Sequence, residues 1–439
     1  MKKVFIGYVE IAGYYHHLSH GLREIGYSVD EYYYESHKFQ YDPKVEAPRR
    51  IFRKLREARQ AYMAVVNYRF DMNKAYLLAS YLFYGNLFFA YMLFSYDVFI
   101  LSFGSSIFSN NKELKFLKVF GKTIITNIAH GSEARPPYLN GVKLDEQGKW
   151  PSLEKLVFMT QIIKGNIRSI EKYSDYVIGA PLTSQLLERQ FVNYFSLGLP
   201  NPSKKKTEKK QKVDTISHIR ILHSPSNPQV KGTAVIRTVI DDLKKAGYQI
   251  DYVEVINRPN IEVMDEILKC DFVIDQLYSD SPLATFATEA AFLGKPAIIG
   301  GYGWEELKKW IPKNEFPVGV LIEPSELYCT VEKLILDYKL RKDLGEAARN
   351  FVLANWDRNR VATKYDLLIK GEVPSCWMLN PTNICYIMGV GLSKEKALEN
   401  LKSIFDQYDD LSLGIIDKPY LRLEIAKQLR NSKTLKIVY

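Results

Sequence analysis

Short apolar runs alternate with amphipathic stretches along the first 200 residues of the chain. Residues 4–8 form an apolar run, residues 17–25 have a helical pattern, and Gly26 ends that pattern before a second run at 27–34. Alternation of this kind is typical of α/β domains with parallel strands. It predicts three more strands, at 97–101, 122–127 and 176–178. We therefore expect residues 1–200 to form one Rossmann-like α/β domain.

The same alternation starts again after residue 216. Strands are predicted at 219–223, 250–255, 271–277, 297–299 and 318–322. Helices are predicted at 232–246, 261–269 and 283–293, and two more run through 325–353. We expect a second α/β domain over 217–370, joined to the first by a Pro- and Lys-rich linker at 201–216. Parallel strands place ligands at their carboxyl ends, so two such domains would leave a substrate cleft between them.

The C-terminal part, residues 371–439, lacks this rhythm and shows one strong helical pattern, at 393–408. We expect an extension packed on the first domain, where it would help to shape an acceptor site. Deleting it should then spare donor binding and impair transfer.

Composition and charge exclude several classes of protein. The 439 residues are 46% hydrophobic and 25% charged, which is globular composition. The net charge is +10, but the run at 204–212, with six Lys and one Glu, supplies half of it, so a nucleic-acid-binding face is not indicated. The four cysteines have no CxxC spacing and the N-terminus lacks a signal-peptide core. A cytoplasmic protein is expected.

One segment raises the question of a membrane. Residues 75–96 carry no charge over 22 positions, but they include Gly85 and Asn86 and lead directly into a predicted strand, so we favour a domain helix over a spanning one. The preceding residues 48–59 are basic, with Ile51, Phe52 and Leu55 on one helical face. This pattern suits attraction to anionic lipid at the inner face of a membrane, and equally a solvated helix face.

Several catalytic motifs are absent from the sequence. It has no GxSxG, no GxxxxGK[ST], no GxGxxG after the first strand and no Asp-x-Asp. His16, His17 and His20 cluster without HExxH or carboxylate spacing, so a polar helix face is favoured and no metal site is expected.

The most informative segment runs from residue 275 to 301. The small residues Ser281, Pro282 and Ala284 precede a predicted helix, whose first N–H groups would be open to an anion. Glu289 lies on a face otherwise formed by Ala and Phe. Its carboxylate either meets a partner such as a pair of ribose hydroxyls or reaches solvent, and the pattern leaves both open.

This segment resembles the donor-binding signature of retaining GT-B glycosyltransferases of the glycogen-synthase-like family 4. That signature has two Glu separated by seven residues, then Ala and Gly-Lys-Pro. Glu289 matches the second Glu, with Ala290 and residues 294–296 in register, whereas Ser281 occupies the first Glu position beside Asp280.

Two further segments resemble the same family. After the strand at 219–223, Lys231 and Gly232 match the Lys-Gly of its Arg-x4-Lys-Gly loop, with Ser226 at the Arg position; His223 or Arg220 could compensate for that Arg. Residues 130–135 resemble its His-Gly-Ser/Thr-Asp motif. His130 would approach the donor sugar, with Glu133 at the Asp position, Gly13 in the first strand–helix turn near the sugar phosphate and residues 201–202 at the interdomain hinge.

The resemblance, which covers about residues 1–370, implies an α/β GT-B fold with two Rossmann-like domains facing across a cleft. It implies metal-independent, retaining transfer of a hexosyl group from a nucleotide diphosphate sugar to an envelope glycan or glycolipid, with no cofactor and with possible peripheral membrane contact. The implied catalytic residues are His130, Lys231 and Glu289. The implied substrate-binding residues are Gly13, Glu133, Ser226, Ser281, Pro282, Leu283, Ala284 and Thr285.

Two alternatives remain, and the departures at Ser226 and Ser281 motivate the first of them. The chain could be a catalytically weak GT-B homologue that acts as a carbohydrate-binding or partner subunit. It could also be a GT-B sugar-nucleotide epimerase, which is disfavoured because acid/base carboxylates are not apparent.

Overall fold

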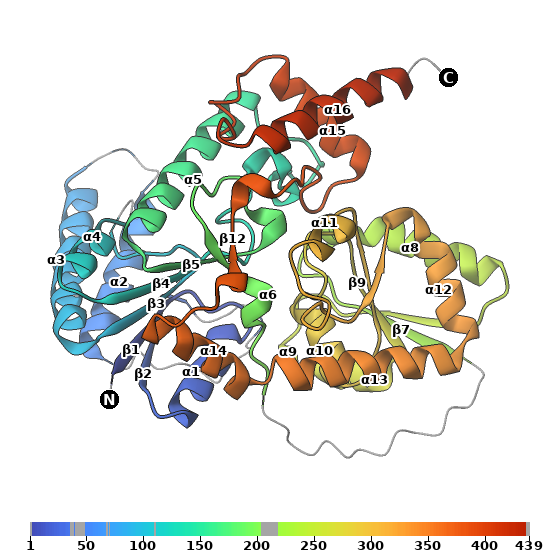
Figure 1. Cartoon of the computed structure of the whole chain (residues 1–439), viewed down its shortest axis with the longest axis horizontal. Helices are drawn as coiled ribbons and strands as arrows, with labels where there is room; N and C mark the ends of the chain where they lie inside the picture. Colours follow the sequence, from blue (N-terminus) through green and yellow to red (C-terminus); the bar gives the residue numbers. More distant parts are fainter. Residues whose placement is uncertain are drawn as a thin grey trace.

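The computed structural model describes residues 2–35, 39, 49–66, 69, 71–108, 111–202 and 218–435 of the chain. Figure 1 shows two α/β domains side by side, with the C-terminal extension lying over the first. Most of the expected linker, residues 203–216, falls outside the described residues.

The first domain is built on a seven-stranded sheet with the order β12-β6-β5-β4-β3-β1-β2. Its strands are β1 (Lys3–Tyr8), β2 (Ser28–Tyr33), β3 (Val98–Ser102), β4 (Thr123–Asn127), β5 (Tyr176–Gly179), β6 (Phe191–Asn193) and β12 (Met378–Leu379). All neighbouring strands pair in parallel except β12, which is antiparallel to β6. The central strands β3 and β4 are buried almost throughout, as a parallel sheet covered on both faces requires.

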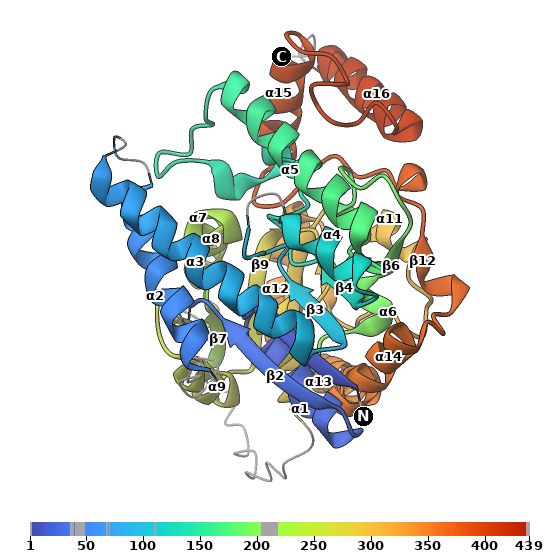
Figure 2. The ribbon, with the colours of Figure 1, turned by 90° about the vertical axis from the view of Figure 1, so that its left-hand side faces the viewer.

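The helices of this domain are α1 (Tyr14–Glu24), α2 (Arg50–Val65), α3 (Met72–Ser95), α4 (Lys112–Val119), α5 (Leu153–Tyr173) and α6 (Tyr194–Leu197). Helices α2 and α3 pack against each other, and Figure 2 shows this pair at the outer side of the domain. Asp71 caps α3 by accepting the backbone N–H of Lys74. On the apolar face of α2, Phe52 and Leu55 are fully enclosed, so these two side chains are not available to a membrane.

The second domain has a five-stranded parallel sheet with the order β11-β10-β9-β7-β8. Its strands are β7 (Ile219–His223), β8 (Ile250–Glu254), β9 (Phe272–Ser279), β10 (Ala297–Gly301) and β11 (Val320–Ile322). Its helices are α7 (Pro228–Lys231), α8 (Thr233–Lys245), α9 (Asn260–Lys269), α10 (Thr285–Phe292), α11 (Trp304–Lys308), α12 (Leu327–Leu336) and α13 (Tyr338–Asn355).

The chain then returns to the first domain. Helix α14 (Arg358–Lys370) packs against α1 at Gly21, where an added Cβ would lie 2.3 Å from the Arg358 carbonyl oxygen. The outgoing and returning segments are bonded to each other: Asn201 N–H donates to the Trp356 carbonyl at 2.9 Å, and Arg358 N–H donates to the Asn201 carbonyl at 3.1 Å. Two Rossmann-like domains with a returning helix form the GT-B architecture, and this prediction is confirmed.

The extension packs mainly on the first domain through β12, α15 (Lys394–Phe405) and α16 (Pro419–Leu435). Asn400 Nδ2 donates to the Tyr138 carbonyl at 2.7 Å, and the Tyr138 hydroxyl donates to the Leu413 carbonyl at 3.0 Å. The same segment also touches the second domain, because Gly391 N–H donates to the Tyr278 carbonyl at 2.9 Å. The extension therefore contacts both domains beside their interface.

Candidate functional site

Two adjoining cavities lie between the domains, at the carboxyl ends of the strands. The first, of about 230 Å³, is lined mainly by loops of the second domain, and we call it the loop cavity. The second, also about 230 Å³, lies beside residues 199–202, and we call it the hinge cavity. Ala12, Asn260, Thr285 and Glu289 line both, so the two cavities share a wall, and we call them together the recess.

Lys231 lies in the wall of the loop cavity at the end of α7. Its Nζ is 3.2 Å from Oδ1 of Asp275, a fully buried carboxylate on β9, while the Lys231 side chain is 16% exposed. The turn after Lys231 needs glycine, since Gly232 has φ 75° and an added Cβ would lie 2.8 Å from the Leu277 Cβ. The ammonium group is thus held at the cavity edge by one buried acceptor, and it remains within reach of a ligand.

Ser226 lines the same cavity, but neither of the residues expected to replace the missing arginine does. His223 is fully buried, with Nδ1 2.7 Å from the Ile274 carbonyl and Nε2 2.9 Å from Thr233 Oγ1, and burial lowers its pKa. Arg220 pairs with Asp251 and Glu266 near the start of β7. The proposed compensation by His223 or Arg220 is therefore wrong. A different basic residue, Arg258, lines the cavity instead.

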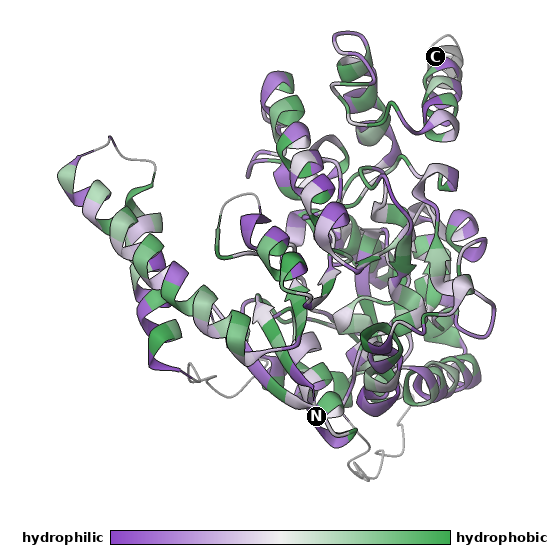
Figure 3. Cartoon of the chain, turned by 60° about the vertical axis from the view of Figure 1, so that its left-hand side comes forward, coloured by the Kyte–Doolittle hydropathy of each residue, from purple (hydrophilic) through white to green (hydrophobic). Residues whose placement is uncertain are grey.

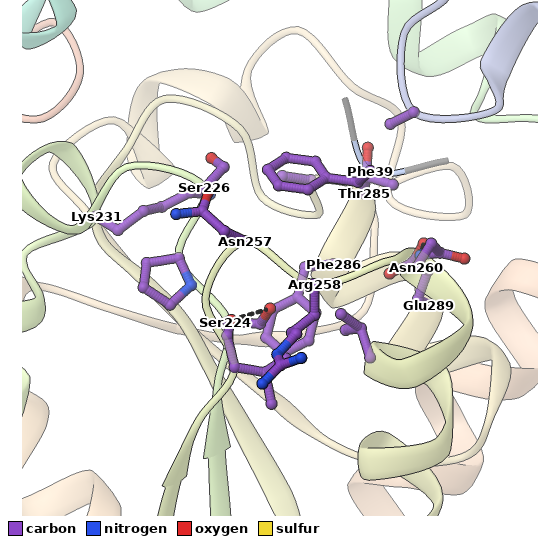
Figure 4. Close-up of a pocket in the computed structure, with 15 residues that line it drawn as sticks. Phe39, Ser224, Ser226, Lys231, Asn257, Arg258, Asn260, Thr285, Phe286 and Glu289 are labelled. Atoms are coloured by element: carbon purple, nitrogen blue, oxygen red, sulfur yellow. Dashed lines mark hydrogen bonds between the residues drawn. The ribbon is translucent and has the colours of Figure 1, made fainter. Parts of the chain in front are cut away.

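Glu289 faces both cavities from the middle of α10. Its Oε1 accepts a hydrogen bond from Asn260 Nδ2 at 2.7 Å, and the side chain is half-buried. In Figure 4, Glu289 and Asn260 lie at one side of the loop cavity and Lys231 at the other, with Asn257 and Phe39 between them. A cation and a carboxylate at opposite sides of one recess can bind a ligand that carries both negative charge and hydroxyl groups.

The residues before α10 divide into two groups. Ala284, which caps α10 without a side-chain hydrogen bond, lines the loop cavity together with Thr285. Pro282 and Leu283 are buried and line neither cavity. Ser281 also lines neither, and its N–H donates to Ser279 Oγ at 3.0 Å. The first turn of α10 thus meets the recess, whereas the position of the family's first Glu does not.

On the first-domain side, His130 lines the hinge cavity within a group of tyrosines. Its Nε2 is 2.8 Å from the Tyr15 hydroxyl, and its ring packs edge-on against Tyr14 and Tyr194, with centroids 5.3 and 5.8 Å away. Burial lowers the pKa of His130 to about 3, so the imidazole is neutral at physiological pH. This wall offers polar atoms without charge.

Glu133 and Gly13 support this wall from behind, since neither lines a cavity. Glu133 Oε1 accepts the His130 N–H at 2.7 Å, and burial raises the pKa of Glu133 to about 7. Gly13, with φ 80°, forms the turn into α1, and Ala12 beside it is the residue that reaches the recess.

A buried ion pair joins the two sides of the recess. Arg135, in the loop after β4, donates through Nε to Asp280 Oδ2 at 2.7 Å and through Nη2 to the same oxygen. Both side chains are only 7% exposed. Asp280, which adjoins Ser281, is therefore engaged by the first domain.

Histidines 16, 17 and 20 lie on α1, and only His17 lines a cavity. Burial lowers the pKa of His17 to about 4. In the part of the chain that the structure describes, no group of three or more His, Cys, Asp or Glu side chains is placed to hold a metal ion.

Sequence reasoning missed several residues of the recess. Asn257, Arg258 and Asn260 follow β8, and Asp275 lies within β9. The rule that parallel strands present ligand sites at their carboxyl ends could have found the three residues after β8. No comparable signal existed for Tyr14 and Tyr194, because tyrosine is abundant throughout this sequence.

No protein-family model matches the chain, and neither does any curated protein sequence. Among solved structures it is similar to HepE of Anabaena in complex with UDP, with 10% identity and a TM-score of 0.43 over 84% of this chain and 100% of that one. It is similar to the glycosyltransferase SnogD of Streptomyces nogalater (11%, 0.40, 84% and 99%) and to MnaA of S. aureus with UDP (12%, 0.40, 85% and 99%). These values are too low to transfer an activity, and the fold assignment rests on the strand topology.

Proposed function

We propose that the protein is a metal-independent, retaining hexosyltransferase that uses a nucleotide diphosphate sugar. The observation that carries this proposal is the placement of Lys231, Glu289 and the first turn of α10 around one recess between two Rossmann-like domains. A nucleotide diphosphate sugar has the matching chemistry: two phosphates, ribose hydroxyls and sugar hydroxyls in a row.

In this proposal the second domain binds the donor. Lys231 contacts the diphosphate as a point charge, and N–H groups at the start of α10, with the positive end of the helix dipole, face the same phosphates. Arg258, which lines the loop cavity, adds a second cation where the family's arginine is replaced by Ser226. Glu289, positioned by Asn260, accepts hydrogen bonds from ribose hydroxyls.

The first domain supplies the opposite wall. His130 is neutral and lies against Tyr15, so it acts as a hydrogen-bonding contact for the donor sugar rather than as a cation. In the transfer step the bond between the sugar carbon and the diphosphate oxygen breaks, and the acceptor oxygen bonds to that carbon on the same face. The acceptor proton passes to the departing diphosphate. Charge grows on the diphosphate during this step, which is where Lys231 and the α10 N–H groups stabilise it.

The acceptor in this proposal is an envelope glycan or glycolipid. It enters from the first domain, in a cytoplasmic protein that makes peripheral contact with the inner face of the membrane. Enclosure between two domains holds the acceptor hydroxyl in place and excludes water.

A panel of nucleotide sugars tests the function. Release of free nucleotide from one donor, lost in Lys231→Ala and kept in Lys245→Ala, supports a transferase. Lys245 is a matched control because it is an exposed lysine at the end of α8. Turnover of no donor, together with no binding of any nucleotide in calorimetry, contradicts the proposal.

One observation favours a second candidate function, a carbohydrate-binding or partner subunit. Ser281, which stands where the family has a sugar-binding Glu, lines neither cavity. Nucleotide-sugar binding without turnover would support this candidate. A donor recovered with a changed sugar would instead indicate the epimerase.

A further inference from the structure

Helix α3 presents a long uncharged stripe to the outside of the first domain. Its exposed large apolar residues follow the helical period and reach 87% exposure at Met72, 70% at Tyr76, 59% at Phe83 and 81% at Phe94, with Leu82 and Leu87 between them. Lys74 is the only charged residue in the helix. Of its most apolar 18-residue window, 22% is buried. The outer face of a helix in a globular protein is ordinarily polar, so this stripe is unusual.

The opposite side of α3 is anchored in the domain. Gly85, Phe88 and Met92 are buried, and the Phe88 ring lies 5.0 Å from that of Phe52 on α2. The polar residue Asn86 on the exposed side has its amide satisfied within the helix, since Nδ2 donates to the Leu82 carbonyl at 2.8 Å. The stripe therefore faces away from the domain core, and the Asn86 amide on it already has a hydrogen-bond acceptor.

The stripe continues onto α4. Phe116 packs against Phe89 of α3, with ring centroids 6.2 Å apart, and Phe116, Val119 and Phe120 are all more than half exposed. Figures 2 and 3 show α3 along the outer side of the domain, and the hydropathy colouring in Figure 3 is mostly apolar along it. We call the outer faces of α3 and α4 together the apolar face.

Basic residues lie on the two helices next to the α3 stripe, α2 and α4. Helix α2, which packs along α3, carries five basic residues and one acidic residue, a net charge of +4. Lys112, Lys115 and Lys118 lie on α4 among its exposed apolar residues. An apolar stripe between basic groups matches the boundary between the acyl chains and the headgroups of an anionic bilayer.

We infer that the apolar face docks on an anionic bilayer, with α3 lying in the plane of the membrane. Helix α3 is long enough to cross a bilayer, but a crossing would pull Phe88 and Met92 out of the domain core. Strand β3 begins at Val98, only three residues after α3 ends at Ser95. This connection is too short to link a membrane-spanning helix to a strand inside the domain. Pairing with a second copy is disfavoured because two basic faces would repel each other.

Docking would bring the first domain to a membrane-anchored acceptor, and this role rests on the proposed function. The docking itself depends on the surface alone. Donor turnover in solution and vesicle binding are therefore separate readouts, and failure of one leaves the other interpretable.

The test is flotation of the full chain with two kinds of vesicle, one of equal parts phosphatidylcholine and phosphatidylglycerol and one of phosphatidylcholine alone. We expect binding to the anionic vesicles at low salt, release by raised salt, and release by alkaline carbonate. No binding at low salt, equal binding to neutral vesicles, or retention in carbonate would each overturn the inference.

Two double variants separate the apolar and electrostatic contributions. Phe83→Asp/Phe94→Asp should weaken partition at least tenfold, because two apolar side chains are lost from the interface. Arg53→Glu/Lys54→Glu should weaken it roughly tenfold or more, since each basic residue near the surface contributes on the order of 1 kcal/mol. All four positions are exposed, and the two variants fail independently if one does not fold.

The matched controls lie on the second domain. Val235→Asp/Leu336→Asp and Lys244→Glu/Lys245→Glu likewise replace two apolar residues by Asp and two basic residues by Glu, at exposed positions of α8 and α12. Partition of these controls should stay within about twofold of wild type. Equal loss in the controls, or a dimer in sedimentation that Phe83→Asp/Phe94→Asp abolishes, would assign the face to something other than lipid.

Discussion

The two walls of the recess treat their polar groups in opposite ways. On the second-domain wall, Lys231 and Glu289 reach the cavity with their charged ends, and they contact Asp275 and Asn260, respectively. On the first-domain wall, His130 is enclosed by tyrosines and is neutral at physiological pH. One wall therefore presents charge to a ligand and the other presents neutral polar and aromatic surface.

This difference separates two tasks. A charged ligand gains most from the second-domain wall, whose charged groups lie at the cavity. A paired group there can give up its protein partner and bind the ligand. A neutral wall excludes water without repelling a neutral ligand. The Arg135–Asp280 pair, by contrast, is sealed away from both cavities and serves to join the walls.

The largest expected effect comes from breaking the Arg135–Asp280 ion pair that joins the two walls. Asp280→Ala leaves the Arg135 guanidinium buried without its carboxylate, and we expect the free energy of unfolding to fall by about 3–5 kcal/mol in chemical denaturation. Asp242→Ala, which breaks the exposed ion pair between Lys245 and Asp242 on α8, should change the free energy of unfolding by less than about 1 kcal/mol. Equal effects of the two variants would mean that the interdomain pair contributes no more than a surface pair.

Next in size is the loss of the cation. Lys231→Ala should lower kcat roughly thirtyfold to a thousandfold, equivalent to about 2–4 kcal/mol, because the ammonium meets charge that grows in the transition state. Donor KM should change less. Steady-state kinetics with the correct donor measure both, and Lys245→Ala should match wild type. A rise in KM alone would place Lys231 in ground-state binding only.

A smaller effect is expected at the other side of the recess. Glu289→Gln should raise donor KM by on the order of tenfold to a hundredfold and leave kcat nearly unchanged, since ribose hydroxyls change little during transfer. Glu346→Gln, at an exposed position of α13, is the control. If kcat falls with KM unchanged, Glu289 acts on the reacting centre and the assignment to the ribose is wrong.

The smallest effect concerns the pH dependence of the neutral wall. The pKa of His130 falls from 6.5 in the unfolded chain to about 3 in the fold, so the unfolded state binds the extra proton and stability is lost as pH falls below about 6.5. The slope is at most about 1.4 kcal/mol per pH unit. His130→Gln should remove this contribution. The Tm of the variant minus the Tm of wild type should therefore increase as the pH is lowered from 7.5 to about 5.

Glu133 acts in the opposite direction. Its pKa rises from 4.5 to about 7, so its stabilising proton is lost as pH rises through 7. In wild type the two contributions offset each other between about pH 4.5 and 6.5, and Glu133→Gln should expose the His130 slope. If the plots of Tm against pH run parallel for wild type and both variants, burial perturbs the pKa of neither group.

The alternating pattern was enough to predict the two sheets, because buried parallel strands are short apolar runs. It missed β6, which has three residues, and β12, which has two and pairs from the distant extension. Around the recess, Lys231 and Glu289 could be named because the short segments that carry them, with Gly232 and Gly294, resemble motifs of a known family. Partners such as Asp275, Asn260 and Arg135 could not, since their contacts join residues 29 to 145 positions apart.

The double crossing at Asn201 and Arg358 has a mechanical consequence. Because the outgoing and returning segments are bonded side by side, a rotation of the domains about an axis through that point would keep both hydrogen bonds. The hinge cavity lies next to this axis, whereas Ser226 and Lys231 lie in the more distant loop cavity. Such a rotation would widen the loop cavity more than the hinge cavity, because the loop cavity lies farther from the axis.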